Sequence, residues 1–504
     1  MCMRTSIANR HSIHSLKAVV TALLVVIASS SASAFQMRLE DDRVWLQARN
    51  LDLMDLMERF AHLGVDVEMD PTISARLNAR VENASLESTL TDLLSDYGYV
   101  LTWDILEGPM GRMSRLAGIR VFRPGEPDAM ETIFTEQDQF QVARAGDGSG
   151  IEFVADEIIV GFAPGSNPRA IRQLIHEIGG TVVESVPELG IYRIRLPPGT
   201  NVLALNERLK SHPLIAVAEP NFVYRLPELQ SAGQGSASQI GSTRSPGSGT
   251  SPVAVLDSGI RLVGGLDRYV QGGYNALHPD RDPIDTAGHG TQMALIASGA
   301  VTPAGASDGE GIPILAIRSF DDAGVTSNFA MMRSILHAAS EGAAVLNMSW
   351  GSPVNSEFMA TTIAAALRND LVVVAASGND GQAVPLFPAA YDGVVAVGAV
   401  LPDGRPWPQS NHGDHVLLAA PGQADFPIGF GGRPGAYSGT SIASAHVSHA
   451  LGRFRARHPR ASAAQSVQAL IRAVEAENEA GRDQFIGHGV LTPTALERFL
   501  QSAP

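Results

Sequence analysis

Four polar residues in this sequence lie in short segments rich in glycine and other small residues. Asp257 directly follows an apolar run, His289 lies between two glycines, Asn379 follows Ser377-Gly378, and Ser441 follows Gly439-Thr440. A hydroxyl becomes a nucleophile when an imidazole takes its proton and a carboxylate orients the imidazole. An asparagine amide can stabilise the oxyanion that the attack creates. These residue types therefore predict acyl transfer at Ser441.

Each segment taken alone has a simpler structural explanation. A carboxylate after a strand also occurs in nucleotide-binding folds, and a histidine or asparagine between glycines is common in turns. A serine before a helix is an ordinary cap. The order Asp257, His289, Asn379, Ser441 is what favours a single site, because Asp, His and Ser follow one another in a known triad order.

Regular elements surround the four segments. Apolar runs without polar alternation predict buried strands, and helical spacing predicts helices between them. The strands are expected at 252–256, 314–317, 345–348, 371–376 and 394–397, and the helices at 327–340, 357–369 and 441–455. This alternation predicts an α/β fold in which helices cover both faces of a parallel sheet. Active sites of such sheets form at the carboxyl ends of the strands.

The motifs Asp257-Ser258-Gly259, Gly288-His289-Gly290-Thr291, Gly378-Asn379 and Gly439-Thr440-Ser441 resemble those of subtilisin-like serine proteases. The resemblance implies a catalytic domain over residues 252–501 that hydrolyses protein or peptide substrates. It implies Asp257, His289 and Ser441 as the triad and Asn379 as oxyanion donor. Ser349-Trp350-Gly351 resembles the family's substrate-binding strand, and 487–490 its closing segment.

Two positions depart from the family pattern. Gln292 stands where a second histidine is often found, and Ala445 stands where proline is usual. Alanine is a good helix former, so we expect the helix after Ser441 to persist. His446 and His449 are expected to be packing or surface residues.

Residues 151–227 predict an α+β domain without a catalytic cluster. The stretches 156–164, 188–192, 196–200 and 218–221 resemble the propeptide of subtilisin-like proteases. The resemblance implies a domain that assists folding and blocks the active site until it is cleaved. The alternative is a structural domain that is never removed. Residues 228–251 are rich in Gly and Ser, which predicts a flexible linker where processing could occur.

Residues 35–125 predict a further α+β domain with the order βαββαβ. Its segments 46–51 and 81–86 resemble the short N-terminal domain of secretins and TonB-dependent receptors. The resemblance implies contacts with cell-envelope proteins through residues 44–122 and passage through a Gram-negative periplasm.

The first 34 residues have the pattern of a signal peptide. Basic residues precede an apolar run at 18–28, and small residues lead to Ala34. The alternative is an uncleaved membrane anchor. Cys2, the single cysteine, lies upstream of this cleavage site. We therefore expect a periplasmic or secreted protein.

The composition narrows the range of partners. The 504 residues carry a formal net charge of −15, which disfavours nucleic acid as a partner because phosphate binding needs clustered Lys and Arg. Calcium is plausible from the family resemblance, but no regular ligand cluster is assignable, and no cofactor is expected to be required. Two alternatives to an endopeptidase stay open: an envelope-binding protein with a silent protease domain, and a hydrolase of esters.

Overall fold

The computed structural model describes residues 35–40, 43–62, 65–70, 72–108, 111–125, 130–132, 140–146, 148–186, 189–227, 229–233, 250–263, 265–279, 281–428 and 434–504. The expected signal peptide and most of the expected linker lie outside these residues. The chain divides into two compact units. The first contains residues up to Gln141 together with Ala155–Pro220, and the second contains Val142–Val154 and Asn221–Pro504. Within the described residues, no helix combines the length and apolar character needed to cross a membrane.

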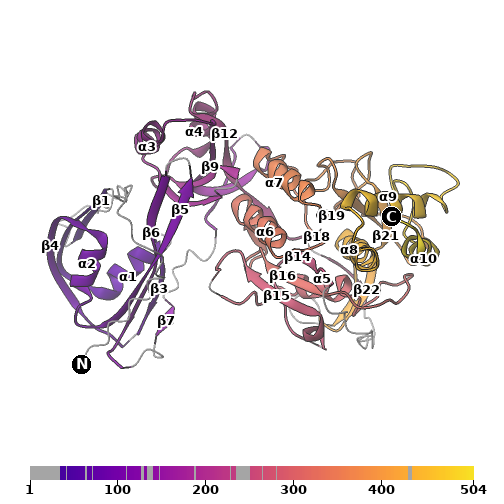
Figure 1. The fold of residues 1–504 in the computed structure, drawn as a ribbon, viewed down its shortest axis with the longest axis horizontal. Coiled ribbons are helices and arrows are strands. Elements are labelled where there is room, and N and C mark those ends of the chain that lie inside the picture. Colours follow the sequence, from indigo (N-terminus) through magenta and orange to yellow (C-terminus); the bar gives the residue numbers. More distant parts are fainter. Residues whose placement is uncertain are drawn as a thin grey trace. The chain divides into compact units, whose positions relative to one another are not determined.

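The N-terminal part of the first unit has two sheets and two helices (Figure 1). The helices are α1 (Leu53–His62) and α2 (Leu86–Leu93). One sheet has the order β1-β2-β4, with β1 (Phe35–Glu40), β2 (Arg43–Asp52) and β4 (Arg76–Ser85). The other has the order β5-β6-β3-β7, with β3 (Asp66–Met69), β5 (Gly98–Gly108), β6 (Gly111–Phe122) and β7 (Glu131–Thr132).

The predicted βαββαβ order of this part is confirmed by β2, α1, β3, β4, α2 and β5. The helix α1 buries an apolar stripe at helical spacing, with Leu53, Leu56, Met57 and Phe60 all in the core. Strands β1, β6 and β7 were not predicted. Strand β6 carries several arginines and pairs along its length with β5, so its partner, and not an alternating pattern, defines it.

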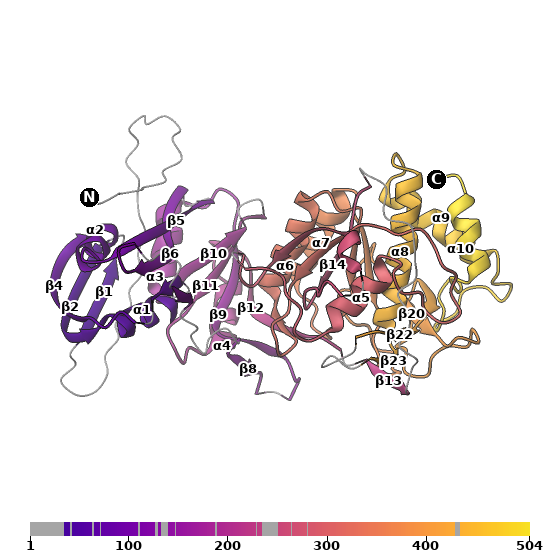
Figure 2. The same ribbon diagram turned by 90° about the horizontal axis from the view of Figure 1, so that it is seen from below.

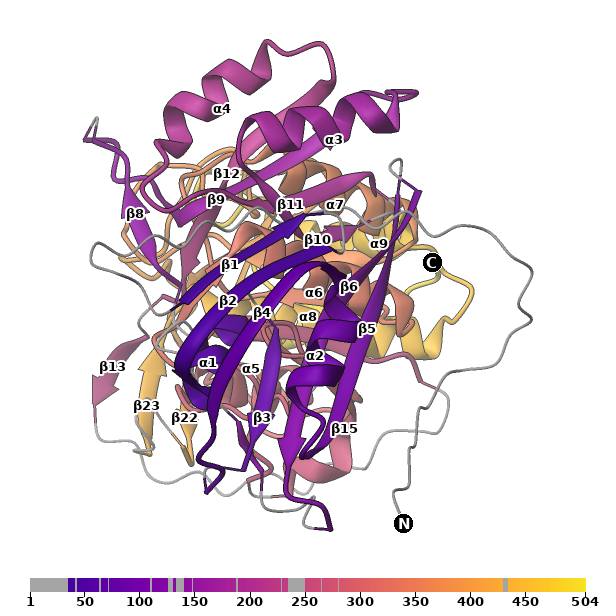
Figure 3. The same ribbon diagram turned by 90° about the vertical axis from the view of Figure 1, so that its left-hand side faces the viewer.

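The second part of the first unit is an α+β layer (Figure 3). Its strands follow the order β10-β11-β9-β12, with β9 (Glu152–Phe162), β10 (Thr181–Val186), β11 (Ile191–Arg195) and β12 (Ile215–Arg225). The helices are α3 (Pro168–Glu177) and α4 (Val202–Lys210). Both begin at asparagine caps, Asn167 and Asn201, whose side chains accept from backbone N–H groups. These strands and helices match the α+β character predicted for residues 151–227. Strand β12 continues into the second unit at Asn221.

The second unit is built on a parallel sheet of the order β15-β16-β14-β18-β19-β20-β21 (Figure 2). Its strands are β14 (Val253–Asp257), β15 (Val270–Asn275), β16 (Ile314–Arg318), β18 (Val345–Met348), β19 (Val372–Ala376), β20 (Val395–Val400) and β21 (Leu418–Pro421). Neighbouring strands of this sheet pair in parallel. The predicted α/β fold and its buried strands are confirmed.

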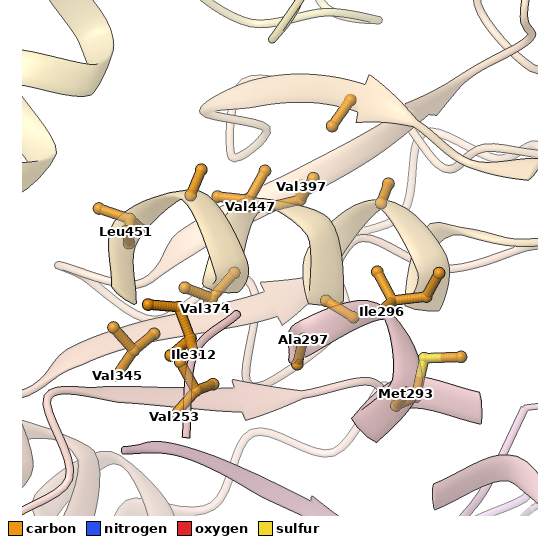
Figure 4. Packing of buried hydrophobic residues seen from close by; sticks show 14 of the residues in the cluster. Val253, Met293, Ile296, Ala297, Ile312, Val345, Val374, Val397, Val447 and Leu451 are labelled. Carbon is orange, nitrogen blue, oxygen red and sulfur yellow. The ribbon is translucent and has the colours of Figure 1, made fainter. Parts of the chain in front are cut away.

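Helices cover both faces of this sheet. On one face lie α5 (His289–Ala297) and α8 (Thr440–Arg457), and on the other lie α6 (Asn328–Ser340) and α7 (Glu357–Arg368). Two further helices, α9 (Ala463–Glu475) and α10 (Pro493–Gln501), pack beyond α8. Figure 4 shows the core under α5 and α8, where side chains of both helices meet strand residues such as Val253, Val345 and Val374.

Three short strands form a separate antiparallel sheet with the order β13-β23-β22. They are β13 (Gln230–Gly233), β22 (Gln423–Phe426) and β23 (Gly435–Ser438). Strand β13 lies inside the stretch predicted to be linker. Its own sequence has no strand pattern, and its pairing is supplied by β23.

Candidate active site

Asp257 is the last residue of β14, and its side chain is completely buried. The carboxylate accepts a hydrogen bond from the backbone N–H of Ser258 at 2.8 Å. Both of its oxygens lie against Nδ1 of His289, at 2.7 and 2.8 Å. A carboxylate in this position fixes the orientation of the imidazole and stabilises its protonated form.

His289 is the first residue of α5. The loop after β14 and the first turn of α5 approach each other so closely that a β-carbon on Gly290 would collide with the carbonyl oxygen of Gly259. No residue other than glycine fits at position 290 without moving this backbone. The small residues beside Asp257 and His289 therefore let the two side chains meet.

Sequence reasoning missed Asp285, a buried carboxylate that supports the same helix. It accepts from the backbone N–H groups of Gly288 at 2.7 Å and Thr291 at 2.8 Å, and from the hydroxyls of Ser258 and Thr291. The first N–H groups of a helix lack internal acceptors, and a carboxylate there satisfies them. The signal was present in the sequence, because Asp285 stands in the turn just before the helix.

Ser441 is the second residue of α8 and is completely buried. Its hydroxyl donates to the carbonyl oxygen of Ser349 at 3.1 Å. General-base catalysis requires this hydroxyl to turn from the Ser349 carbonyl towards the imidazole of His289. Catalytic hydrogen bonds are often incomplete without substrate.

Asn379 follows β19 and contacts the start of α8 through its side chain. Its Oδ1 accepts from the backbone N–H of Thr440 at 3.0 Å and from the Thr440 hydroxyl at 2.8 Å. Its Nδ2 is buried and has no acceptor within the described part of the chain. Thr440 therefore fixes the amide so that its N–H₂ group stays available to a bound molecule. A buried donor without an acceptor is unusual and points to a functional role.

Ser349-Trp350-Gly351 begins directly after β18. Ser349 contacts α8 three times. Its carbonyl accepts from the Ser441 hydroxyl, and its own hydroxyl donates to the Ser441 carbonyl at 3.4 Å and lies 3.2 Å from the Ser444 hydroxyl. Trp350 is buried at 1% exposure and stacks against Tyr224. The structure thus places this segment beside Ser441, and its role in substrate binding stays a prediction.

The two departures from the family pattern, Gln292 and Ala445, lie within continuous helices, α5 and α8. Gln292 is buried and donates to the carbonyl of Ile428 at 3.1 Å, and α8 continues through Ala445 as expected. Among the described residues, no three His, Cys, Asp or Glu side chains group to hold a metal ion. A calcium ion stays a prediction without assigned ligands.

Helix α8 also carries two buried histidines, His446 and His449. Burial, reinforced by the charge of Arg453, lowers the pKa of His446 to about 4 and that of His449 to about 3. Nδ1 of His449 lies 3.0 Å from the carbonyl oxygen of Ala297 on α5. The neutral ring of His449 therefore ties the serine-bearing helix to the helix of His289.

We expect acid to destabilise this unit through these two histidines. In the unfolded chain each takes up a proton near its ordinary pKa of about 6.5, whereas in the folded chain each stays neutral to much lower pH. Their contribution is fully present above about pH 6.5 and falls as the pH drops, by roughly 2 kcal/mol per histidine at about pH 5. Urea unfolding across this pH range measures the loss.

His446→Gln and His449→Gln are each expected to flatten this pH dependence, whatever they do to stability at neutral pH. His176→Gln, which changes an exposed histidine of α3, is the matched control and should leave the slope unchanged. An unfolding free energy that is equally pH-dependent in all three variants and the wild type would contradict the assignment.

Comparison with known proteins agrees with this architecture. The sequence model described as "Subtilase family" matches residues 247–489, and the one described as "Fervidolysin N-terminal prodomain" matches residues 140–221. The solved structure of fervidolysin from Fervidobacterium pennivorans, a keratinolytic enzyme related to subtilisin, superposes with a TM-score of 0.58. That match has 22% identity and covers 73% of this chain and 64% of fervidolysin, so it speaks for the fold.

Two curated relatives have a higher sequence identity to this chain. A thermophilic serine proteinase of Bacillus sp. (strain AK1) is 32% identical over 307 residues, which cover 58% of this chain and 76% of the relative. Thermitase of Thermoactinomyces vulgaris is 32% identical over 204 residues, which cover 40% of this chain and 73% of thermitase. With the parallel sheet and the matched prodomain, these relatives show that the chain belongs to the subtilase family of serine endopeptidases.

Proposed function

We propose that this subtilase cleaves peptide bonds with Ser441 as nucleophile, His289 as general base and Asp257 as the group that orients His289. The observation that carries the proposal is the contact of both Asp257 oxygens with Nδ1 of His289, at the strand end next to the helix that carries Ser441. This contact directs the Nε2 lone pair of the neutral imidazole away from Asp257, as a base for the serine hydroxyl requires.

The reaction proceeds in two halves. Ser441 Oγ attacks the scissile carbonyl while His289 takes the hydroxyl proton, and His289 then gives that proton to the leaving amine. Water repeats the sequence on the acyl-enzyme and regenerates Ser441. The oxyanion of each tetrahedral intermediate accepts hydrogen bonds from the Ser441 backbone N–H and from Nδ2 of Asn379.

Covalent labelling tests the assignment of the nucleophile. A fluorophosphonate probe is expected to modify Ser441 in the full chain, to abolish casein hydrolysis in proportion to labelling, and to be found on the Ser441 peptide by mass spectrometry. Absence of both labelling and hydrolysis would support the silent-domain alternative. Hydrolysis of a peptide ester without hydrolysis of casein or peptides would support the esterase alternative.

Asn379→Ala is expected to lower kcat by about 10²–10³ with little change in KM, because the lost donor acts on the transition state. Asn379→Asp is the matched control, because its carboxylate oxygens can still accept from Thr440 while the amide donor is gone. We expect Asn379→Asp to keep the thermal stability of the wild type and still lose kcat. Steady-state kinetics on a peptide substrate measures both variants, and a fall in kcat of less than about threefold in Asn379→Ala would exclude the role.

We further propose that the protein is exported and that its prodomain is removed after folding. The apolar run before Ala34 and the match of the prodomain model support this order of events. The N-terminal part, residues 44–122, is proposed to contact envelope proteins, with its βαββαβ order as support. Mass spectrometry of the protein from its native host gives the mature N-terminus and tests export and removal together. Recovery of only the unprocessed chain, starting at Met1, would contradict both export and removal of the prodomain.

A further inference from the structure

The residues that follow the prodomain-like segment 140–221 pair with two strands of the second unit, β17 and β23. The last residues of β12 pair antiparallel with β17 (Val325–Ser327), with Tyr224 opposite Thr326. The backbone N–H of Leu226 then donates to the carbonyl of Gly324 at 2.9 Å. Four residues later, Gln230 of β13 pairs with Ser438 of β23, three residues before Ser441.

Both contacts are additions to the edge of a sheet, which is a common way for a protein to bind an extended peptide. Leu229 is buried, and a β-carbon on Gly439 would lie 2.6 Å from Cδ2 of Leu229 and 3.5 Å from Nδ2 of Asn379. The chain therefore passes the start of α8 as a peptide substrate would. A substrate bound in this way would present a bond in the stretch 226–230 to Ser441.

Upstream of this stretch, the side chain of Tyr224 is buried among residues of the same unit. Its side chain is 3% exposed, and its ring stacks on Trp350 with centroids 4.9 Å apart. The phenol hydroxyl donates to Oδ1 of Asn328 at 3.1 Å. Phe320 packs edge-on against the indole of Trp350. The pocket thus has aromatic walls and one polar contact for an incoming ring.

Asn328 is held in place by the fold. It is completely buried, and its Nδ2 donates to Oγ of Ser356 at 2.8 Å. Ser356 is the N-cap of α7 and is itself fixed by the backbone N–H of Met359. Because Nδ2 is already engaged, Oδ1 is the atom of Asn328 turned to the pocket. A tyrosine hydroxyl satisfies this buried acceptor, whereas a phenylalanine ring leaves it without a donor.

We propose that Asn328 is a specificity-determining residue that selects tyrosine over phenylalanine at the substrate position occupied here by Tyr224. The inference rests on the proposed function and refines it. Sites that bind a substrate hydroxyl in a buried contact discriminate against the analogue that lacks it. We expect a preference on the order of tenfold in kcat/KM, which corresponds to one buried hydrogen bond.

The test uses a synthetic peptide with the sequence of residues 221–233 and a second peptide with phenylalanine in place of Tyr224. The full-length enzyme is first incubated until its own processing is complete. The wild type is expected to cleave the tyrosine peptide about tenfold more efficiently, at a bond between Leu226 and Gln230 that product masses identify. The ratio of two substrates on one enzyme does not depend on the folded fraction.

Two variants separate recognition from folding. Asn328→Ala is expected to bring the Tyr/Phe ratio close to one, whatever its effect on the overall rate of peptide cleavage. Asn328→Asp keeps an acceptor oxygen and is expected to restore the preference. A wild-type ratio near one, an unchanged ratio in Asn328→Ala, or cleavage only outside 226–230 would overturn this inference. Loss of all peptide and casein hydrolysis in the wild type would instead overturn the proposed function, on which the inference rests.

Discussion

Replacing Ser441 by alanine is expected to lower kcat on peptide substrates by about 10⁶-fold, the size known for removal of the nucleophile in subtilisin, a relative of this chain. In the proposed mechanism the side-chain oxygen of Ser441 forms the acyl-enzyme, and alanine has no atom that could do so. The remaining oxyanion donors still bind the transition state, so a residual rate of about 10³–10⁴ over the uncatalysed reaction should persist. Burst kinetics with a peptide ester measures the loss of acylation directly.

The same experiment tests whether His289 and Ser441 act as one unit. His289→Ala alone should cost about as much as Ser441→Ala, and the double variant should be no slower than either single variant. If the fold-reductions in kcat of the two single variants multiplied in the double variant, His289 and Ser441 would not share one step. Folding of each variant is checked by its urea midpoint, because the imidazole of His289 is buried. Ser441→Ala retaining more than about 1% of wild-type kcat would exclude Ser441 as nucleophile.

Replacing Asp257 by asparagine is expected to lower kcat by about 10⁴-fold at neutral pH. The carboxylate contacts Nδ1 of His289 with both oxygens, so it holds the tautomer whose Nε2 can accept the serine proton. An asparagine amide in the same place can donate to Nδ1 and so favours the tautomer that already carries a proton on Nε2. Steady-state kinetics should show the fall in kcat with little change in KM.

Asp285→Asn is the matched control for this prediction. Both carboxylates are fully buried near the start of α5, but Asp285 accepts from backbone and hydroxyl groups, not from the imidazole. We expect Asp285→Asn to lower the unfolding free energy by about 1–3 kcal/mol and to reduce kcat far less than Asp257→Asn. Equal losses of kcat in the two variants would mean that Asp257 acts by supporting the fold.

The elements around the site could be predicted because their signals are local. Strand β18 occupies Val345–Met348 as expected, and α6 ends at Ser340 as expected. Apolar runs of four to six residues and helical spacing express the burial of each element, whichever neighbours supply that burial. The helix of Ser441 was also predicted, and its start at Thr440 differs by one residue.

The extra strands could not be predicted in the same way. Strand β13 has the sequence Gln-Ser-Ala-Gly, and small polar residues of this kind are typical of linkers. It becomes a strand because the edge of β23 offers hydrogen-bond partners. Strand β6 likewise depends on β5. Sheet pairing of this kind is decided by the partner and leaves little trace in the strand's own sequence.

The residue types, their order and the strands and helices that carry them were sufficient to predict a serine nucleophile, its base and a parallel α/β fold. The contacts that complete the site were decided by the tertiary structure alone. Ser441 meets the Ser349 carbonyl across 92 residues, Thr440 meets Asn379 across 61, and Tyr224 meets Asn328 across 104. Local pattern carries no information about such pairs, because hydrogen bonds between distant segments depend on how whole elements pack and not on the sequence near either partner.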